Sequence, residues 1–422
     1  MSKTYALSQI RNRGAATVVA SVKAAYCTPA HLARLEKCFQ PSAHHREFER
    51  AGRGASRDRR YLGEPGPAML YLENLRVIVG EVDRDGWERL QKSAALDDVR
   101  GAPPLRPVTG LGSDADVAAA GEVSWGLDKI GASALWAKGL SGKGVLVAHL
   151  DTGIDGTHPS LKDAIEQFAE FNATGQAVAG APVADSAEHG SHTAGTIAGR
   201  PSGGRSIGVA PGCKLISGTV IEGGDPVARI LAGVNWAMGF PIRVLNLSAG
   251  FEGHFDQYAP LLTTLRAKGV LPVFAAGNFG PGHSAAPANY PQAMAVGAID
   301  SSGAMDPDSS SELLKRKIDP QVPDLVMPGD DVISANAGGG FRADSGTSMA
   351  APHAAGLAAL LWEACPAATV DQVESAIYSS CARPGSLKPD RAGRGLPDAV
   401  KALAALEALV AAKRPAVGGA AG

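Results

Sequence analysis

Beyond residue 122, short runs of apolar residues alternate with longer segments whose apolar positions recur at helical spacing. The runs are rich in Val, Ile, Leu and Ala and lack the polar alternation of a strand with one face in water. Such strands, separated by helices, predict an α/β fold with a doubly wound, mostly parallel sheet. The predicted strands are Val145 to Leu150, Leu215 to Val220, Val244 to Leu247, Val270 to Ala275 and Ala293 to Ile299. The predicted helices lie near residues 190–199, 226–239, 256–268 and 349–363.

The first hundred residues follow a different order. Strands are predicted at Thr17 to Val22, Met69 to Leu72, Leu75 to Val79 and Leu96 to Val99, with helices starting after Thr28 and near Asp85. This β-α-β-β-α-β order predicts a small α+β domain of the ferredoxin-like type. The whole chain is therefore divided into a tail at 1–14, this domain at 15–107 with a basic, loop-like insertion at 41–66, a linker at 108–122, the α/β domain at 123–406 and a flexible tail at 407–422.

Composition narrows the function classes only modestly. The chain of 422 residues has a formal net charge of −2, and its excess of Lys and Arg within residues 1–60 is typical of solvated loops, so no nucleic-acid partner is predicted. No apolar run is long enough to cross a membrane, and no membrane partner is predicted. Lys23 interrupts the only apolar stretch near the N-terminus, which favours a cytoplasmic location over secretion. The cysteines are odd in number and widely spaced, which argues against a disulfide framework or a cysteine zinc site: Cys27, Cys38, Cys213, Cys365 and Cys381.

The segment from Asp344 to His353 carries the strongest chemical signal. Ser348 follows Gly346 where a glycine turn opens a long apolar segment that is predicted to be a buried helix. A hydroxyl at that point is exposed beside the unpaired backbone N–H groups of the first helical turn. Ser348 could therefore be a nucleophile, or Thr347 or Ser348 could simply cap the helix. Residues elsewhere in the chain have to decide between a nucleophile and a helix cap.

Three further polar motifs stand at junctions between predicted strands and helices. Asp151 follows the first strand, His189 opens a segment that leads into a helix, and Asn278 lies in a glycine turn after the fourth strand. Taken singly, the aspartate and the asparagine are ordinary turn residues, and the histidines at 189 and 192 lack other ligands at metal-binding spacing. Ligands of parallel sheets bind at the carboxyl ends of strands, so the residues just after each strand are the first candidates for a site.

Together, the motifs resemble those of the subtilisin-like serine proteases (subtilases, peptidase S8). The matching segments are Leu150 to Asp155, His189 to Thr196, Ala275 to Asn278 and Gly346 to His353, and the resemblance spans about residues 123–406. It implies a serine endopeptidase with a triad of Asp151, His189 and Ser348, in which the Asn278 side chain and the Ser348 backbone N–H stabilise the oxyanion. His192 and His353 match family positions that are not catalytic, and His149 is predicted to be a satisfied core histidine.

The resemblance also places the substrate. Leu247, Ser248, Ala249 and Gly250 resemble the family segment that pairs with an extended substrate backbone and forms one wall of the S1 pocket, and Ala276 and Gly277 are assigned to the same substrate site. Asn289 stands in a segment that resembles the base of the S1 pocket, where many relatives carry glycine. A side chain there predicts a preference for small to medium P1 residues over large aromatic ones.

One departure concerns calcium. Where many relatives supply calcium ligands, this chain has Ser160 and Ser202, and a serine is a poor substitute for a carboxylate or amide oxygen. The strong calcium site of the family is therefore not expected, calcium elsewhere is left open, and no other cofactor or metal is predicted.

The N-terminal domain has the β-α-β-β-α-β order that precursors of this family commonly carry as a propeptide. The resemblance implies an intramolecular inhibitor, cleaved by autoprocessing in the linker before Val123, and a monomer once mature. The alternative is a permanently attached domain that docks a partner or gates access. The substrate is expected to be a protein or peptide. Two other functions stay open: a pseudoprotease that binds a partner, and a peptide ligase or cyclase that uses the same acyl-enzyme.

Overall fold

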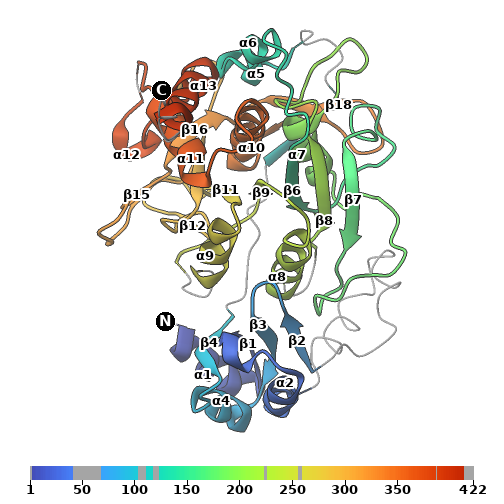
Figure 1. The fold of residues 1–422 in the computed structure, drawn as a ribbon, viewed down its shortest axis with the longest axis vertical. Coiled ribbons are helices and arrows are strands. Elements are labelled where there is room, and N and C mark those ends of the chain that lie inside the picture. Colours follow the sequence, from blue (N-terminus) through green and yellow to red (C-terminus); the bar gives the residue numbers. More distant parts are fainter. Residues whose placement is uncertain are drawn as a thin grey trace, which may run out of the picture.

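Two packed units make up the chain, a small N-terminal domain and a larger α/β domain (Figure 1). The computed structural model describes residues 2–40, 68–102, 111–116, 123–222, 226–254, 259–385 and 387–412. The predicted loop at 41–66 lies outside these residues, and within the predicted linker at 108–122 only the backbone of β5 (Leu111–Asp116) is described.

The N-terminal domain is an antiparallel four-stranded sheet in the order β2-β3-β1-β4, which confirms the predicted β-α-β-β-α-β order. Thr28 caps α2 by accepting a hydrogen bond from His31 N, and Asp83 caps α4 in the same way. The sequence placed residues 1–14 in a tail, but they include a helix, α1, which packs on β1 and β4 and buries Ala6. The elements are α1 (Ser2–Arg13), β1 (Ala16–Val22), a 3₁₀ turn (Ala24–Tyr26), α2 (Pro29–Glu36), β2 (Met69–Leu72), β3 (Val77–Val82), α4 (Arg84–Gln91) and β4 (Leu96–Gly101).

The α/β domain is built on a seven-stranded sheet whose paired strands are all parallel, in the order β16-β13-β11-β9-β6-β8-β7. The five predicted strands are confirmed to within one residue at each end. Two edge strands were missed: one is half-exposed and polar, and the other is short and ends in proline. The strands are β6 (Leu146–Asp151), β7 (Ile165–Glu170), β8 (Lys214–Thr219), β9 (Val244–Leu247), β11 (Leu271–Ala275), β13 (Met294–Ile299) and β16 (Leu325–Pro328).

Alternate residues of the central strands serve two separate cores, because successive strand side chains point to opposite faces. Val147 faces the core that contains α7 and α10, whereas Ala148 faces the core that contains α8 and α9. The four predicted helices are present, and the predicted start of α9 at residue 256 lies outside the described residues. The helices are α5 (Trp125–Lys129), α6 (Ala132–Trp136), α7 (His189–Ala198), α8 (Pro226–Ala237), α9 (Ala259–Ala267), α10 (Thr347–Ala364), α11 (Val370–Ser380), α12 (Pro389–Ala392) and α13 (Ala399–Ala412).

The C-terminal end is more ordered than the sequence indicated. The flexible tail was placed at 407–422, but α13 continues to Ala412 and packs on α11 and α6, with Val410 partly buried against the core. Short antiparallel pairings complete the described fold: β10 (Phe251–Glu252) with β12 (Ala285–Ala286), β14 (Glu312–Leu313) with β15 (Gln321–Val322), and β17 (Val332–Ala335) with β18 (Phe341–Ser345) and β5. No helix in the described parts of the chain is long and apolar enough to span a membrane.

The N-terminal sheet is buried on both faces. One face, with Val18 and Ile78, packs in the domain's own core with its helices. The opposite face packs in the same apolar cluster as α8 of the α/β domain, and its buried members are Val19, Leu72, Leu75, Val77, Val79 and Ala102. The β2-β3 turn adds polar contacts, because Asn74 hydrogen-bonds Asn235 of α8 through both its backbone and its side chain. The two domains therefore share a continuous interface, which lies beneath α8 and α9 in Figure 1.

Candidate active site

The predicted catalytic residues meet at the carboxyl edge of the parallel sheet. Asp151 is the last residue of β6, and Asn278 follows β11 by three residues. His189 is the first residue of α7, and Ser348 is the second residue of α10. The helices α7 and α10 pack against each other on one face of the sheet, so their N-terminal ends lie together. The geometry thus brings together side chains that are up to 197 residues apart, from Asp151 to Ser348.

Asp151 and His189 form a short hydrogen bond. His189 Nδ1 donates to Asp151 Oδ1 at 2.6 Å, and the same oxygen accepts the Thr152 backbone N–H at 2.7 Å. Burial alone would raise the pKa of Asp151, but the adjacent His189 lowers it below its ordinary 3.8. Burial alone would lower the pKa of His189, but the charge and hydrogen bond of Asp151 raise it above its ordinary 6.5. The pair is therefore arranged so that a proton on His189 is stabilised.

The start of α7 is fixed by side chains that accept its first backbone N–H groups. Thr152 Oγ1 accepts the Gly190 N–H at 2.8 Å, and Asp185 Oδ2 accepts the Ser191 N–H at 2.6 Å. Thr152 Oγ1 in turn donates to Asp185 Oδ1 at 2.7 Å. These contacts tie the first turn of α7 to the end of β6, and His189 is held beside Asp151 as a result.

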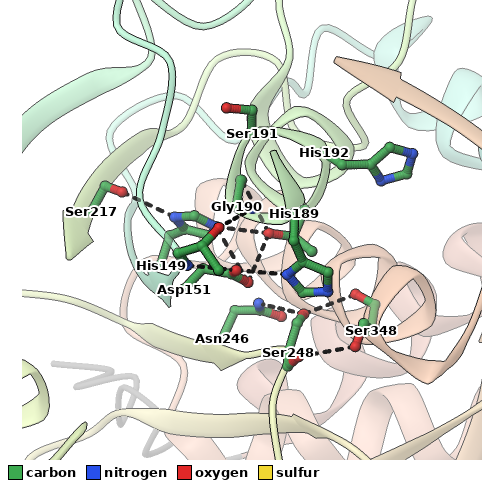
Figure 2. A network of polar contacts seen from close by, with 12 residues as sticks. His149, Asp151, His189, Gly190, Ser191, His192, Ser217, Asn246, Ser248 and Ser348 are labelled. Atoms are coloured by element: carbon green, nitrogen blue, oxygen red, sulfur yellow. Dashed lines mark hydrogen bonds and ion pairs between the residues drawn. The ribbon is translucent and has the colours of Figure 1, made fainter. Parts of the chain in front are cut away.

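Ser348 lies at the start of α10, beside Ser248. Its hydroxyl donates to the Ser248 backbone carbonyl at 2.9 Å, and Ser248 Oγ donates to the Ser348 carbonyl at 2.8 Å (Figure 2). His189 Nε2 has no hydrogen-bond partner among the residues that the structure describes. The structure therefore does not join Ser348 and His189 directly, as is common for catalytic pairs without substrate. A rotation of the serine side chain about its Cα–Cβ bond would redirect its hydroxyl.

Asn278 is oriented by the residue before the serine. Its Oδ1 accepts hydrogen bonds from Thr347 N at 2.9 Å and from Thr347 Oγ1 at 2.8 Å. The Nδ2 group is next to Gly346, where an added Cβ atom would lie only 2.8 Å from it. Gly346 has φ of +131° and ψ of 171°, a backbone conformation that is essentially restricted to glycine. The glycine therefore leaves room for the asparagine at the start of α10.

The predicted substrate segment lies directly after β9. Leu247 ends that strand, and Ser248 contacts Ser348 as described above, while Ala249 is buried and Gly250 precedes β10. Ala276 and Gly277 connect β11 to Asn278, and Ala276 N pairs with the neighbouring strand residue Val296. These segments and Ser348 are therefore close together, while their contacts with a substrate stay a prediction.

Asn289 is fully buried and held from two sides. Its Nδ2 group donates to the Gly253 carbonyl at 2.8 Å and to Ser284 Oγ at 2.9 Å. Ser284 Oγ in turn donates to Glu312 Oε2 at 2.6 Å. The amide is therefore locked in place beside the β10-β12 pair rather than free to swing aside.

The remaining histidines of the motifs are buried. Burial lowers the pKa of His192 to about 4 and that of His353 also to about 4, so both are neutral near pH 7. Each donates one ring N–H to a backbone carbonyl, Val332 O and Met349 O respectively. These contacts fit structural roles.

The described residues contain no cluster of side chains that could bind a metal ion. Within the described ranges, no three His, Cys, Asp or Glu side chains gather as a metal-binding group. Ser160, at one position where relatives bind calcium, is fully buried with its carbonyl accepting Arg200 N, and Ser202 pairs with Arg205 in a turn. Calcium binding stays an open expectation.

Sequence reasoning did not assign three residues to the surroundings of the predicted catalytic groups. Thr347 orients Asn278, and Thr193 donates to Asp151 Oδ2 at 3.0 Å. His149, which was assigned to the core, hydrogen-bonds Thr193 and Ser217. The sequence spacing could have identified two of them. His149 lies two residues before Asp151 on one strand, and Thr193 lies four residues after His189 on one helix. Both spacings put side chains on the same face.

Sequence similarity to known proteins includes most of the α/β domain. The profile of the subtilase family matches residues 142–397. Subtilisin Savinase of Lederbergia lenta is 36% identical over 269 residues, which cover 63% of this chain and 93% of that protein. An alkaline protease of Shouchella clausii is 36% identical over 279 residues, 65% of this chain and 68% of that protein. Bacillopeptidase F of Bacillus subtilis (strain 168) is 34% identical over 320 residues, which are 67% of this chain but only 22% of that protein. The chain thus spans about a fifth of this last relative and most of the shorter ones.

Proposed function

The chain belongs to the subtilase family of serine proteases, and from that premise we propose that it is an endopeptidase whose nucleophile is Ser348. The observation that carries the proposal is the 2.6 Å hydrogen bond between Asp151 and His189, which leaves the opposite ring nitrogen of His189 without a partner beside Ser348. In Figure 2 the His189 ring lies between Asp151 and Ser348. An imidazole held in this way can accept a hydroxyl proton at Nε2.

The proposed reaction proceeds through an acyl-enzyme. Ser348 Oγ attacks the carbonyl carbon of the scissile bond while its proton passes to His189 Nε2, and Asp151 stabilises the resulting imidazolium. His189 then gives that proton to the leaving amine as the carbon–nitrogen bond breaks. A water molecule repeats the sequence in the second half of the reaction and releases the new carboxylate, with His189 again as the base.

The tetrahedral intermediate needs hydrogen-bond donors for its oxyanion. The Ser348 backbone N–H belongs to the first turn of α10, where backbone N–H groups have no partner within the helix. Asn278 Oδ1 is occupied by Thr347, so the amide is oriented with Nδ2 as its donor end. We assign the Asn278 Nδ2 group and the Ser348 N–H to the oxyanion.

We propose in addition that the chain is made as an autoinhibited precursor. The support is the shared apolar cluster between the N-terminal sheet and α8, together with the contacts of Asn74 with Asn235 and of Lys268 Nζ with Asn74 Oδ1 at 3.0 Å. A domain docked through a continuous apolar face is an intramolecular ligand of high effective concentration.

The linker strand supports the same proposal. β5 pairs antiparallel with β18, and the backbone of Leu111 lies opposite Ser345, three residues before Ser348. The chain between the two domains is therefore held next to the start of α10, where an intramolecular cut in the linker before Val123 would be made.

The test is intact mass spectrometry of purified wild type and Ser348→Ala, followed by a casein assay. We expect the wild type to lose its N-terminal domain, to degrade casein and to be blocked by a serine-directed fluorophosphonate, while the variant stays full length. If both proteins stay full length and the wild type is inert, the N-terminal domain is a constitutive lock or the chain is a partner-binding module, and the proposal of a self-activating endopeptidase is wrong. An active wild type that stays full length contradicts only the precursor proposal.

For the substrate, we propose peptides and proteins with small to medium P1 residues. The buried, doubly bonded amide of Asn289 supports this preference, because filling the base of the S1 pocket would exclude a large ring. A cleavage profile on a peptide library that is dominated by Phe or Tyr at P1 would contradict it.

A further inference from the structure

A second histidine lies directly behind the Asp151–His189 pair. His149 is on β6 two residues before Asp151, so both side chains point to the same side of the strand, and both are fully buried. His149 Nε2 is 4.0 Å from Asp151 Oδ2, which is too far for a direct hydrogen bond. Thr193 of α7 bridges the two, because its Oγ1 is 2.8 Å from His149 Nε2 and 3.0 Å from Asp151 Oδ2.

The acceptors in this group determine where each proton lies. The carboxylate of Asp151 only accepts hydrogen bonds, and it is a stronger acceptor than the Gly190 carbonyl that Thr193 Oγ1 also approaches at 3.1 Å. The threonine proton therefore points to Asp151 Oδ2, and the threonine oxygen must accept from His149 Nε2–H. The other ring nitrogen of His149 then accepts from Ser217 Oγ at 3.0 Å.

The neutral state that this pattern requires agrees with the surroundings of His149. The pKa of His149 lies below the ordinary 6.5, chiefly because the ring is buried. The charge of His189 lowers this pKa further, and the charges of Asp151 and Asp185 oppose the shift without reversing it. A neutral ring with its proton on Nε2 completes a one-directional chain from Ser217 through His149 and Thr193 to Asp151.

We propose that His149 is a positioning residue for the catalytic pair, which acts through the Thr193 hydroxyl to fix the carboxylate of Asp151. With Oδ2 held by Thr193, rotation of the carboxylate is blocked, and Oδ1 stays directed at His189 Nδ1 and Thr152 N. The proposal rests on the proposed endopeptidase function and adds residues to its machinery.

A simple packing role explains this arrangement less well. Ser217, His149 and Thr193 are all fully buried, and burying three polar side chains in a core costs free energy that apolar residues of similar size would not. Their hydrogen bonds run to one end point, the carboxylate that must be oriented for catalysis.

The experiment uses the full-length chain and compares Thr193→Val with Thr196→Val. Both threonines lie on α7, both are fully buried and both have Oγ1 3.1 Å from a carbonyl oxygen of the preceding turn, but only Thr193 contacts Asp151. We expect Thr193→Val to lower kcat about ten-fold with little change in KM, because a hydrogen bond to a charged group is lost. Thr196→Val is expected to keep the wild-type kcat. All rates are normalised to active sites titrated with a fluorophosphonate.

Variants of His149 complete the test. His149→Val should lower kcat by a similar factor, and His149→Gln, whose amide can offer an N–H near the position of Nε2, should restore most of it. The double variant of His149→Val and Thr193→Val should be no slower than either single variant, because both changes break one chain. If His149→Val does not fold, Thr193→Val and His149→Gln decide the question alone.

The results that would overturn the proposal are specific. Wild-type kcat in titrated Thr193→Val, or equal losses in Thr193→Val and Thr196→Val, would show that the chain does not position Asp151. Fully additive losses in the double variant would show that His149 acts by another route. A wild type that hydrolyses no peptide overturns the endopeptidase proposal and the positioning role together, whereas an active wild type with unaffected variants overturns only the latter.

Discussion

Gly346→Ala offers a test of how the start of α10 supports catalysis. At φ of +131° and ψ of 171°, a residue with a Cβ atom is strained by about 1–3 kcal/mol. The added Cβ would also lie 2.8 Å from Asn278 Nδ2, and ordinary contacts begin near 3.4 Å. The asparagine must therefore move by about 0.6 Å, the difference between these two distances, unless the serine turn moves instead. Either movement misaligns the proposed oxyanion donors with Ser348.

The expected result is a fall in kcat of about 10²–10³, similar to the loss of one oxyanion donor, with a smaller change in KM. The assay is hydrolysis of a peptide nitroanilide, normalised by fluorophosphonate titration, with thermal unfolding measured in parallel. Gly339→Ala is the matched control, because Gly339 has a φ of +112° and nothing within 4 Å of an added Cβ atom. It should lose stability but keep kcat. A Gly346→Ala protein with wild-type kcat would refute the reasoning, and equal losses of kcat in both variants would assign the effect to backbone strain alone.

Further predictions address the triad and the substrate pocket. Asn278→Ala should lower kcat about 10²–10³ while KM changes little, measured on the same substrate. The kcat/KM value should rise with pH as His189 loses its proton, with a midpoint above 6.5 because Asp151 outweighs the opposing effect of burial on the His189 pKa. In Asp151→Asn the surviving activity should rise at lower pH, and an unmoved midpoint would contradict this source of the shift. Asn289→Gly should raise kcat/KM for Phe relative to Ala at P1 by about ten-fold on matched peptides, whereas an unchanged ratio would mean that Asn289 does not limit the pocket.

Much of the architecture was predictable because the buried parallel strands have no polar alternation. Their boundaries in turn placed Asp151 and Asn278 at strand ends. The edge strands β7 and β16 were not predictable in the same way, since one is half-exposed and the other ends at Pro328. The helix α1 has few apolar residues, and what orders it is contact with β1 and β4, which the local sequence does not encode.

The candidate site was also predictable only in part. The resemblance of the motifs to those of subtilases predicted the pairing of Asp151 with His189. The hydroxyl direction of Ser348 depends on the Ser248 carbonyl 100 residues away in sequence, and no local pattern reports it. His149 was predicted to be a satisfied core histidine, and its hydrogen bonds bear that out. What its sequence position did not reveal is that its partner Thr193 also holds Asp151, since this depends on how α7 packs against β6.

The doubly buried sheet of the N-terminal domain has a consequence for reversibility. After the proposed cleavage, a released N-terminal domain would expose to water the face formed by Val19, Leu72, Leu75, Val77, Val79 and Ala102. So small a domain has little apolar burial to spare, and losing one of its two covered faces favours the unfolded chain. An unfolded chain is a better protease substrate than a folded inhibitor, so each released copy would be destroyed by the enzyme that it had restrained. Activation would then be irreversible, because exposure of this apolar face to water prevents the released domain from refolding and binding the enzyme again.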